Sequence, residues 1–360
     1  MLIKEGNELM AQNHGPKGDQ KVYHTLEMHV EPLQERAEKI GDILGLSPEQ
    51  RKLIAAAISY HDTTIEYDAP DPENVVGMVR RHRGAREGDQ PMGEKGNEAV
   101  SADDMEKAMR QMNAEAGKDI FSEEQIKTGR WAIDATYPKA DFGPDFKGAE
   151  FEKDPLYEQI IAHNPRVGKM IEFMRERGIT KGPHFSQPHL EDPLIRGEKV
   201  PEEVIAVAVS DLGGFGMEDV QGSFGEGDRE GKESFHNLRN PDTIARLMSD
   251  DKGKKKEDII KDQEDRTKAS NAILGWWGSQ TGFGMWQMMR STKLMYLLEK
   301  NGQLTPEKEA QFNSLLGHYE ENLKAAAERH EAITAQFNEI KEADGDKKAF
   351  EYVAKEMKFV

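Results

Sequence analysis

The sequence predicts an all-α fold, in which a helical bundle with long inserted loops is followed by a helical extension at the C-terminus. Hydrophobic residues recur with helical spacing through most of the 360 residues, and no segment shows the sustained alternation of a strand. Proline stands near the first position of several expected helices, as in Ser47-Pro48, Pro201-Glu202 and Thr305-Pro306. We expect helices at 32–44, 48–62, 97–113, 122–137, 155–177, 201–212, 241–248, 268–300 and 305–341.

The composition limits the classes of protein and of site that the chain can form. With 36% hydrophobic and 32% charged residues, it is polar but has enough apolar residues for a core. The net charge of −18 opposes sequence-independent binding to nucleic acid. Because there is no cysteine, disulfides and thiol catalysis are excluded, and a transition-metal site must use His, Asp and Glu. We see neither a signal peptide nor a membrane span, and expect a cytoplasmic protein.

Three stretches rich in glycine or proline interrupt the expected bundle, which we place at 18–300. They are predicted to be inserted loops at about 68–96, 139–200 and 213–233, the last of which holds seven glycines. Residues 249–268 carry charges of both signs, which is typical of a solvated connector or an exposed helix.

The C-terminal region, 301–360, is expected to be dominated by one long helix over 305–341. Its hydrophobic residues are spaced alternately four and three apart from Phe312 to Ile340, which forms a heptad-like seam weakened at Ala326 and His330. Such a seam favours either a helix that lies on its own domain or a helix that pairs between the subunits of a homodimer.

A histidine and an aspartate stand side by side at the end of the apolar helix over 48–62. Ile54, Ile58 and His61 share one helix face, so the imidazole points to the same side as the isoleucines. Asp62 follows about 100° around the helix and can reach the same point in space. An unpaired carboxylate in an apolar setting costs several kcal/mol, so the pair needs a partner.

The expected helix over 201–212 ends in a similar way. Val204, Val207 and Asp211 share a face, so a carboxylate ends an otherwise hydrophobic stripe. Taken alone, each helix is explained by an ordinary hydrogen bond or by an ion pair with Lys or Arg. Together they supply His, Asp and Asp from apolar faces, which a divalent cation would neutralise. His24, in KVYHTLEMHVEPL, offers a further ligand.

The order of these motifs resembles the HD-domain superfamily of metal-dependent phosphohydrolases. The chain has Tyr-His-x-Leu-Glu, then His-Asp at the end of an apolar helix, then a lone Asp at the end of another. The resemblance implies an all-helical fold and the metal ligands His24, His61, Asp62 and Asp211. Residues 96–102, GNEAVSA, are similar to an Asn-Glu-x-x-Ser-Ala motif of one subgroup of predicted HD hydrolases.

The chain matches this subgroup in a further motif and departs from it in three places. IDAT at 133–136 sits where the subgroup has an apolar residue followed by Ala-Thr. The subgroup often has a histidine four residues after the first ligand, where this chain has Met28, with His29 one further on. Lys139 replaces a histidine that often follows the Ala-Thr, and the spacer 139–200 is longer than usual.

The Asn-Glu-x-x-Ser-Ala motif supplies a candidate for the catalytic base. Glu98 and Ser101 share a helix face with three methionines and are expected to point inward. An inward carboxylate near a metal can orient or deprotonate a water, and Asp134 competes with Glu98 for this role. For Asn97 we expect a helix-capping role.

A cluster of arginines after the His-Asp pair supplies candidates for substrate binding. Bidentate guanidinium contacts suit phosphate oxygens, although a solvated basic loop would look the same in sequence. The candidates are Arg80, Arg81, Arg83, Arg86 and Lys139, with Arg290 as an alternative.

The resemblance implies a metal-dependent phosphohydrolase that hydrolyses a phosphoester of a nucleotide or another small phosphorylated molecule by metal-activated water. The divalent ion would be Mn, Mg, Co, Ni, Fe or Zn. His163, His184 and His189 could support a second metal, in which case an HD-fold di-iron oxygenase is the alternative. A non-catalytic, metal-binding regulatory module is the third interpretation.

Overall fold

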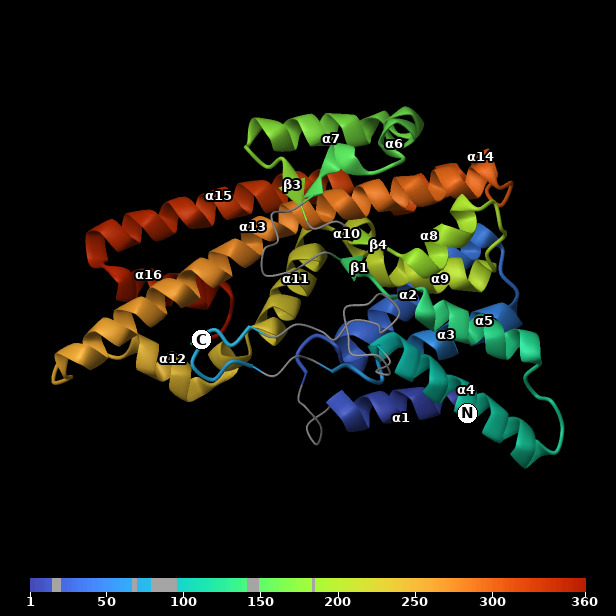
Figure 1. Ribbon diagram of the computed structural model, residues 1–360, viewed down its shortest axis with the longest axis horizontal. Coiled ribbons are helices and arrows are strands. Elements are labelled where there is room, and N and C mark those ends of the chain that lie inside the picture. Colours follow the sequence, from blue (N-terminus) through green and yellow to red (C-terminus); the bar gives the residue numbers. More distant parts are fainter. Residues whose placement is uncertain (15–20, 67–69, 79–95, 141–148, 183–184) are drawn as a thin grey trace. The chain divides into compact units, whose positions relative to one another are not determined.

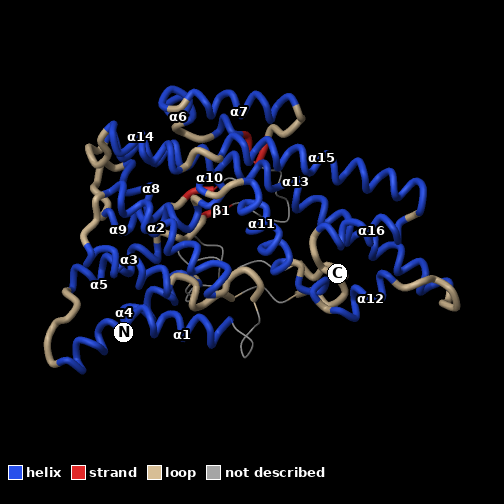
Figure 2. Tube along the Cα trace, turned by 180° about the vertical axis from the view of Figure 1, so that it is seen from behind, coloured by secondary structure: helices blue, strands red, loops and turns tan. Residues whose placement is uncertain are grey.

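The structure is a computed structural model that describes residues 1–14, 21–66, 70–78, 96–140, 149–182 and 185–360 (Figure 1). Over these residues the predicted all-α fold is confirmed. The strands in these ranges have two residues each: β1 (Lys139–Ala140) pairs antiparallel with β4 (Phe185–Ser186), and β2 (Ala149–Glu150) with β3 (Lys181–Gly182). Figure 2 shows how small a part they form beside the helices.

Helices form at most of the predicted positions, but the single helix predicted over 155–177 is two helices, because Asn164 ends one and caps the start of the next. Up to residue 212, the α-helices in the described ranges are α1 (Leu2–His14), α2 (Glu31–Leu44), α3 (Pro48–Tyr60), α4 (Asn97–Ala116), α5 (Glu123–Asp134), α6 (Tyr157–His163), α7 (Pro165–Glu176), α8 (Pro188–Ile195) and α9 (Glu202–Leu212). They are followed by α10 (Gly214–Met217), α11 (Val220–Ser234), α12 (Pro241–Met248), α13 (Lys256–Lys300), α14 (Pro306–Leu315), α15 (Tyr319–Asp344) and α16 (Asp346–Glu356). Shorter turns are the π-helical η1 (Leu26–Val30) and the 3-10 turns η3 (Phe151–Lys153) and η4 (His236–Arg239).

The chain forms two compact units, each assembled from separate stretches of sequence. Unit 1 comprises Met1–Glu66, His82–Asp219 and Gly282–Asn322. Unit 2 comprises Tyr67–Arg81, Val220–Thr281 and Leu323–Val360. This division differs from the expected one into 18–300 and 301–360, because side chains of η4, α12 and α13 share one hydrophobic core with those of α15 and α16.

Unit 1 is centred on α3, which packs against α1, α2, α4, α5 and α9. The helix begins with Pro48, and Ser47 forms a capping box with Gln50. From Leu53 to Tyr60 all side chains except that of Ala55 are buried. Because small alanines stand between the larger apolar residues, helices can approach α3 from several sides.

The predicted loop at 213–233 is wrong, because the structure forms α10 and α11 there. Its glycines allow close packing instead of marking a loop. In unit 2, a Cβ atom at Gly231 would lie 2.5 Å from Trp276 Nε1 and 2.5 Å from Met357 Cε. A glycine that is needed for close approach and a glycine that marks a turn look the same in sequence.

The polar segment 249–268 is part connector and part helix, since α13 begins at Lys256, twelve residues before the predicted start. The single helix predicted over 305–341 is two helices, which are separated by residues 316–318. In unit 2, Ile333 and Phe337 of the heptad-like seam pack in the hydrophobic core of their own chain. This part of the seam therefore has an intramolecular partner, as in the first of the two interpretations.

Two other predicted loops have different outcomes. The insertion at 139–200 contains α6, α7 and α8 together with the four short strands, so it is largely regular structure. Of the insertion at 68–96, residues 68–69 and 79–95 lie outside the described ranges. Residues 75–76 of this segment belong to the hydrophobic core of unit 2.

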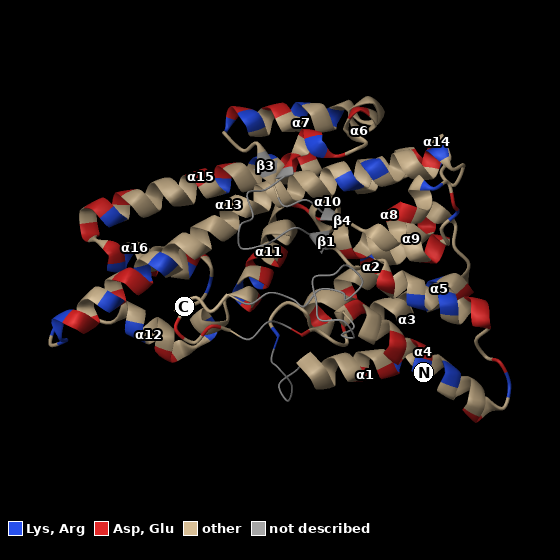
Figure 3. Ribbon diagram, in the orientation of Figure 1, with Lys and Arg blue, Asp and Glu red and all other residues tan. Residues whose placement is uncertain are grey.

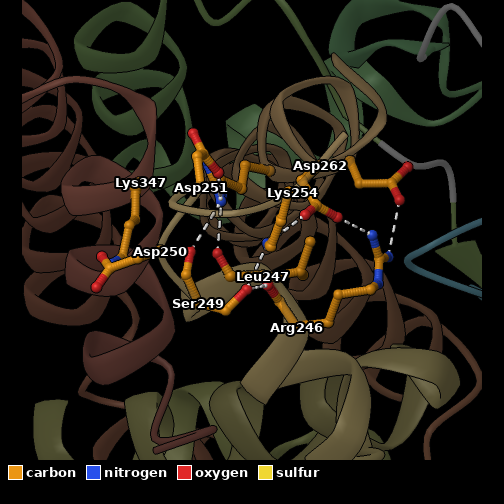
Figure 4. A network of polar contacts seen from close by, with 10 residues as sticks. Arg246, Leu247, Ser249, Asp250, Asp251, Lys254, Asp262 and Lys347 are labelled. Carbon is orange, nitrogen blue, oxygen red and sulfur yellow. Dashed lines mark hydrogen bonds and ion pairs between the residues drawn. The ribbon is translucent and has the colours of Figure 1, made fainter. Parts of the chain in front are cut away.

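Unit 2 contains a buried network of charged side chains (Figure 4). Arg246 pairs with both Asp262 and Asp265, at 2.8 Å from the latter, and Lys254 Nζ lies 2.6 Å from Asp262 Oδ2. The side chains of the two aspartates are only 5% and 7% exposed. Each buried carboxylate of this network thus has a basic partner from the same chain.

The longest stretch of α13 without a charged residue lies between Lys268 and Arg290, and Figure 3 draws such uncharged residues in tan. It contains Gly, Ser, Thr, Gln and Asn as well as apolar residues. Neither this helix nor another one within the described ranges has both the length and the hydropathy that a membrane span requires.

Candidate metal centre

The His-Asp pair lies where α3 ends, at the centre of unit 1. His61 is the C-terminal cap of α3, and its side chain is 1% exposed. Its Nδ1 lies 2.6 Å from the carbonyl oxygen of Ile58. Because a carbonyl oxygen only accepts hydrogen bonds, Nδ1 carries the proton and donates it, which directs Nε2 to the neighbouring Asp62.

Asp211 reaches the same place from α9. This helix packs against α2, α3 and α5, and every residue from Val204 to Ser210 is buried. Asp211 follows as the penultimate residue, with a side chain that is 13% exposed. The apolar helix α9 thus places a carboxylate near the His-Asp pair, and this carboxylate is more exposed to solvent than the His61 side chain.

A third element, the π-helical turn η1, supplies His29. The turn begins after Thr25, whose Oγ1 accepts a hydrogen bond from the backbone N–H of Met28 at 3.2 Å, and it continues into α2. A π-helical turn holds one residue more than an α-helical turn, which shifts the side chains that follow it. His29 is buried and points its Nε2 toward His61.

The four side chains converge on one point. Nε2 of His29 lies 3.1 Å from Nε2 of His61, and Oδ2 of Asp62 lies 3.0 Å and 3.1 Å from these two nitrogens. Oδ1 of Asp211 lies 3.6 Å and 3.8 Å from them. Ligand atoms that each lie about 2.1 Å from one ion, at right angles to each other, are about 3 Å apart. The donor types and their separations therefore fit a divalent cation.

His24 lies at the edge of this cluster. Its Nε2 is 3.9 Å from Oδ2 of Asp62, and with His29 and Asp62 it forms a second group of donors within 4.8 Å of one another. The first such group is formed by His29, His61 and Asp211. The two groups share His29, which makes His29 rather than His24 the central imidazole.

The electrostatics of the cluster favour a positive charge. Burial lowers the pKa of His29 to about 4, although Asp62 acts in the opposite direction. Burial also acts to lower the pKa of His61, but the carboxylates of Asp62 and Asp211 outweigh it and raise this pKa to about 9. Two carboxylates thus stabilise a cation at His61, and burial disfavours a second proton on the neighbouring ring.

Neighbouring segments hold the backbone around the His-Asp pair. From α1, His14 Nε2 lies 2.9 Å from the carbonyl oxygen of Asp62, and Asn13 Nδ2 donates to the carbonyl oxygen of Thr63 at 2.6 Å. This role of α1 was not predicted from the sequence. The predicted capping role of Asn97 is wrong, because Gly96 is the N-cap of α4.

Asn97 and Ser101 instead bind the backbone that follows the His-Asp pair. Asn97 Oδ1 accepts from the backbone N–H of Glu66 at 3.0 Å, and its Nδ2 donates to the carbonyl oxygen of Glu66 at 3.2 Å. Ser101 Oγ accepts from the backbone N–H of Thr64 at 3.2 Å. Two of the motif's polar residues therefore fix the loop that leaves the centre.

The structure thus brings together the four predicted ligands His24, His61, Asp62 and Asp211, and it adds His29. Sequence reasoning noted His29 only as a residue one position away from an expected histidine. A π-helical turn over 26–30 is the feature that could have identified His29. The extra residue in such a turn rotates the following side chains from one helix face to another.

The other predicted site residues have mixed outcomes. Glu98, in the first turn of α4, is buried as expected, and Asp134, the last residue of α5, is partly buried. Lys139 lies in β1. The candidate arginines of the loop lie outside the described residues; these are Arg80, Arg81, Arg83 and Arg86.

The additional histidines do not join this centre among the described residues. His163 lies near Glu299 and Glu309 instead, with its Nε2 3.1 Å from Oε1 of Glu309. The ring of His189 packs near Tyr137, with 6.1 Å between the ring centroids. His184 lies outside the described ranges.

No protein-family model, curated protein or solved structure matches this chain. The geometry of the described residues is therefore the basis for the functional interpretation.

Proposed function

We propose that the chain is an HD-type, metal-dependent phosphohydrolase that acts on a nucleotide or another small phosphorylated molecule. The observation that carries the proposal is the convergence of His29, His61, Asp62 and Asp211 at the ends of buried helices. Among the described residues, no Lys or Arg lies within 4.0 Å of the Asp211 carboxylate, so its close partners are imidazoles. A divalent cation would neutralise such a cluster.

The residues that would hold the cation are these four, with His24 as a further donor. Imidazole and carboxylate together suit Mn, Fe, Co, Ni or Zn better than they suit Mg, which prefers oxygen ligands. When bound, a divalent cation lowers the pKa of water and neutralises negative charge on phosphoryl oxygens. The chain's own contribution is to fix the donors and to exclude bulk water, because three of the four side chains are at most 3% exposed.

Two carboxylates are candidates for positioning or deprotonating the attacking water. Glu98 is buried at the start of α4, in the helix whose Asn97 and Ser101 bind the loop next to Asp62. Asp134, at the end of α5, is the alternative, and α5 packs against both α3 and α9. A base in this position would contribute about 10²- to 10⁴-fold to the rate.

One observation favours a second candidate function, that of a di-iron oxygenase. The two donor groups, one with His24 and the other with His61 and Asp211, overlap at His29 and would suit two neighbouring ions. Two bound iron ions per chain and an optical absorption band would favour the oxygenase. One ion of Mn, Co or Ni with phosphoester hydrolysis would favour the phosphohydrolase.

The experiment is metal analysis of the purified protein followed by a phosphoester screen. The screen comprises nucleoside mono- and triphosphates, cyclic nucleotides and a generic aryl phosphate, each with added Mn²⁺. His61→Ala and Asp211→Ala should lose metal and lower the rate by about 10³-fold, since the ion supplies several kcal/mol of transition-state stabilisation.

A matched control is His318→Ala, because His318 is 43% exposed and pairs only with Glu321 among the described carboxylates. This variant should keep its metal and its rate. Equal metal content and equal activity in the wild type and in the two site variants would disprove the assignment. Metal loss without any phosphoester hydrolysis in the wild type would instead favour the regulatory module.

A further inference from the structure

A buried arginine in unit 1 has no carboxylate partner within ion-pairing distance among the described residues. Arg290, on α13, is 4% exposed. Its Nη1 donates to Oε1 of Gln187, whereas Nε and Nη2 have no hydrogen-bond partner within the described chain. Nε and Nη2 form one edge of the guanidinium, which is the edge that can donate two parallel hydrogen bonds to an oxyanion.

Lys293, three residues later on α13, is also buried, but it has carboxylate partners. Its Nζ lies 2.9 Å from Oε2 of Glu191 and 3.4 Å from Oδ2 of Asp154. These carboxylates raise the pKa of Lys293 against the effect of burial, whereas burial lowers the pKa of Arg290. An ionised group that is buried without full compensation is costly, so Arg290 calls for an explanation beyond stability.

The contacts of Arg290 connect it to α9, the helix that carries Asp211. Gln187, its amide partner, donates from Nε2 to the carbonyl oxygen of Ala208 at 3.2 Å. Ala208 lies on α9, three residues before the ligand Asp211. The charge of Asp211 also acts on Arg290. Gln187 thus links the guanidinium to the helix that carries the most exposed of the four central ligands.

We propose that Arg290 binds the phosphoryl oxygens of the substrate through Nε and Nη2, on the Asp211 side of the centre. This inference rests on the proposed function and narrows the ligand class to a tetrahedral oxyanion such as a phosphate monoester. Gln187 holds the opposite edge of the guanidinium, so the free edge is oriented before the ligand arrives. The oxyanion would be a negatively charged partner for Arg290, as Asp154 and Glu191 are for Lys293.

The experiment measures binding of inorganic phosphate to the metal-free and the Mn²⁺-loaded full chain, by calorimetry and by the shift of the thermal midpoint. Arg290→Lys keeps the charge but loses the two-pronged edge, and should weaken phosphate binding about 10- to 100-fold. Arg290→Met should weaken it at least as much. Lys300→Gln removes an exposed positive charge from the same helix and should leave phosphate affinity unchanged.

Stability and metal content distinguish a ligand-binding role from a structural one. Arg290→Met removes an incompletely paired buried charge, so the metal-free variant should melt at the same or a higher temperature and should bind Mn²⁺ as the wild type does. The proposal is overturned if the wild type does not bind phosphate or if Arg290→Lys binds it with unchanged affinity. It is also overturned if Arg290→Met melts well below the wild type while Arg290→Lys retains phosphate binding.

The two proposals can fail separately. Phosphate binding that depends on Arg290, in a protein that hydrolyses no phosphoester, would uphold the anion site and reject the phosphohydrolase. Phosphoester hydrolysis that is unaffected by Arg290→Lys would uphold the enzyme and reject the anion site.

Discussion

Unit 1 and unit 2 each bury several charged side chains, but the cluster around Asp211 in unit 1 and the network around Asp262 in unit 2 are neutralised differently. In unit 2, Asp262 and Asp265 are paired with Arg246 and Lys254 in a network that the chain completes by itself (Figure 4). In unit 1, Asp211 faces two imidazoles at 3.6 Å and 3.8 Å. Buried carboxylates that are paired with Lys or Arg indicate a structural role, whereas those that face only histidines indicate a site for a ligand.

The pKa shifts agree with this difference. Burial acts to raise the pKa of Asp262, but Lys254 and Arg246 outweigh it and the net shift is downward. In unit 1, the pKa of His61 is raised to about 9, because Asp62 and Asp211 act on it together. In unit 2 the positive charge is covalently part of the chain. In unit 1 the two carboxylates stabilise a positive charge at His61, whose ring can exchange its proton for a metal ion.

The largest expected effect comes from Asp211→Asn, which keeps the size of the side chain and removes its charge. We expect the rate of phosphoester hydrolysis to fall by about 10³-fold, because a ligand of the cation is lost. The metal-free variant should unfold at a slightly lower denaturant concentration than the metal-free wild type, because the Asp211 carboxylate helps to stabilise the protonated His61 ring. A variant with wild-type activity would show that Asp211 is not a ligand.

Removal of the metal should destabilise the wild type but not Asp211→Asn. A ligand at 100 times its dissociation constant stabilises the folded state by about 2.7 kcal/mol. Thermal unfolding of the wild type with and without Mn²⁺, after chelation, measures this difference. An equal shift in Asp211→Asn would mean that the stabilising ion binds elsewhere, for example at His163, Glu299 and Glu309.

The corresponding substitution in unit 2, Asp262→Asn, should have the opposite pattern. It leaves Lys254 without its carboxylate partner and takes one of two carboxylates from Arg246. Because these cations are partly exposed, we expect a loss of about 1–3 kcal/mol in the free energy of unfolding, measured by denaturant titration. Metal content should not change. A loss of metal in this variant would remove the distinction between the two regions.

The smallest expected effect is a pH dependence that arises at His330 in unit 2. Burial lowers the pKa of His330 below its ordinary value of 6.5, and Glu331 offsets this only in part. The unfolded chain therefore binds a proton at His330 more readily than the folded chain does. The stability that this residue contributes is present above about pH 6.5 and is lost as the pH falls below it.

His330→Gln should reduce the loss of stability between pH 7 and pH 5.5, which paired denaturant titrations would detect. His61 has the opposite shift because it has carboxylate neighbours. An unchanged pH dependence in His330→Gln would show that burial alone does not lower the affinity of this ring for a proton.

Helical periodicity was sufficient to predict the all-α fold, and the apolar faces of α3 and α9 were sufficient to select His61, Asp62 and Asp211. The fold could be predicted, and these three side chains could be placed on inward-facing positions, because a buried helix imposes a simple period on its sequence. His29 was missed because a π-helical turn changes this period over five residues. The role of Asn97 was missed for a different reason, since a side chain that binds the backbone of a distant segment leaves no pattern in its own helix.

Two further features could not be predicted from the sequence: the packing role of the glycines in α11 and the boundary between the units. Glycines in α11 look like loop residues until Trp276 and Met357 are seen to occupy the space of a Cβ atom at Gly231. A continuous helix such as α13, whose residues are shared between the units at Thr281 and Gly282, shows no local sign of that division. Both features depend on contacts between segments far apart in the sequence.

The most direct test of the central claim is a calorimetric titration of the metal-free chain with Mn²⁺, in the wild type, Asp211→Asn and Asp262→Asn. We expect the wild type and Asp262→Asn to bind the ion with the same affinity, and Asp211→Asn to lose most of this binding. Equal binding by all three proteins, or no binding by the wild type, would contradict the claim that the histidines and aspartates of unit 1 form a metal centre.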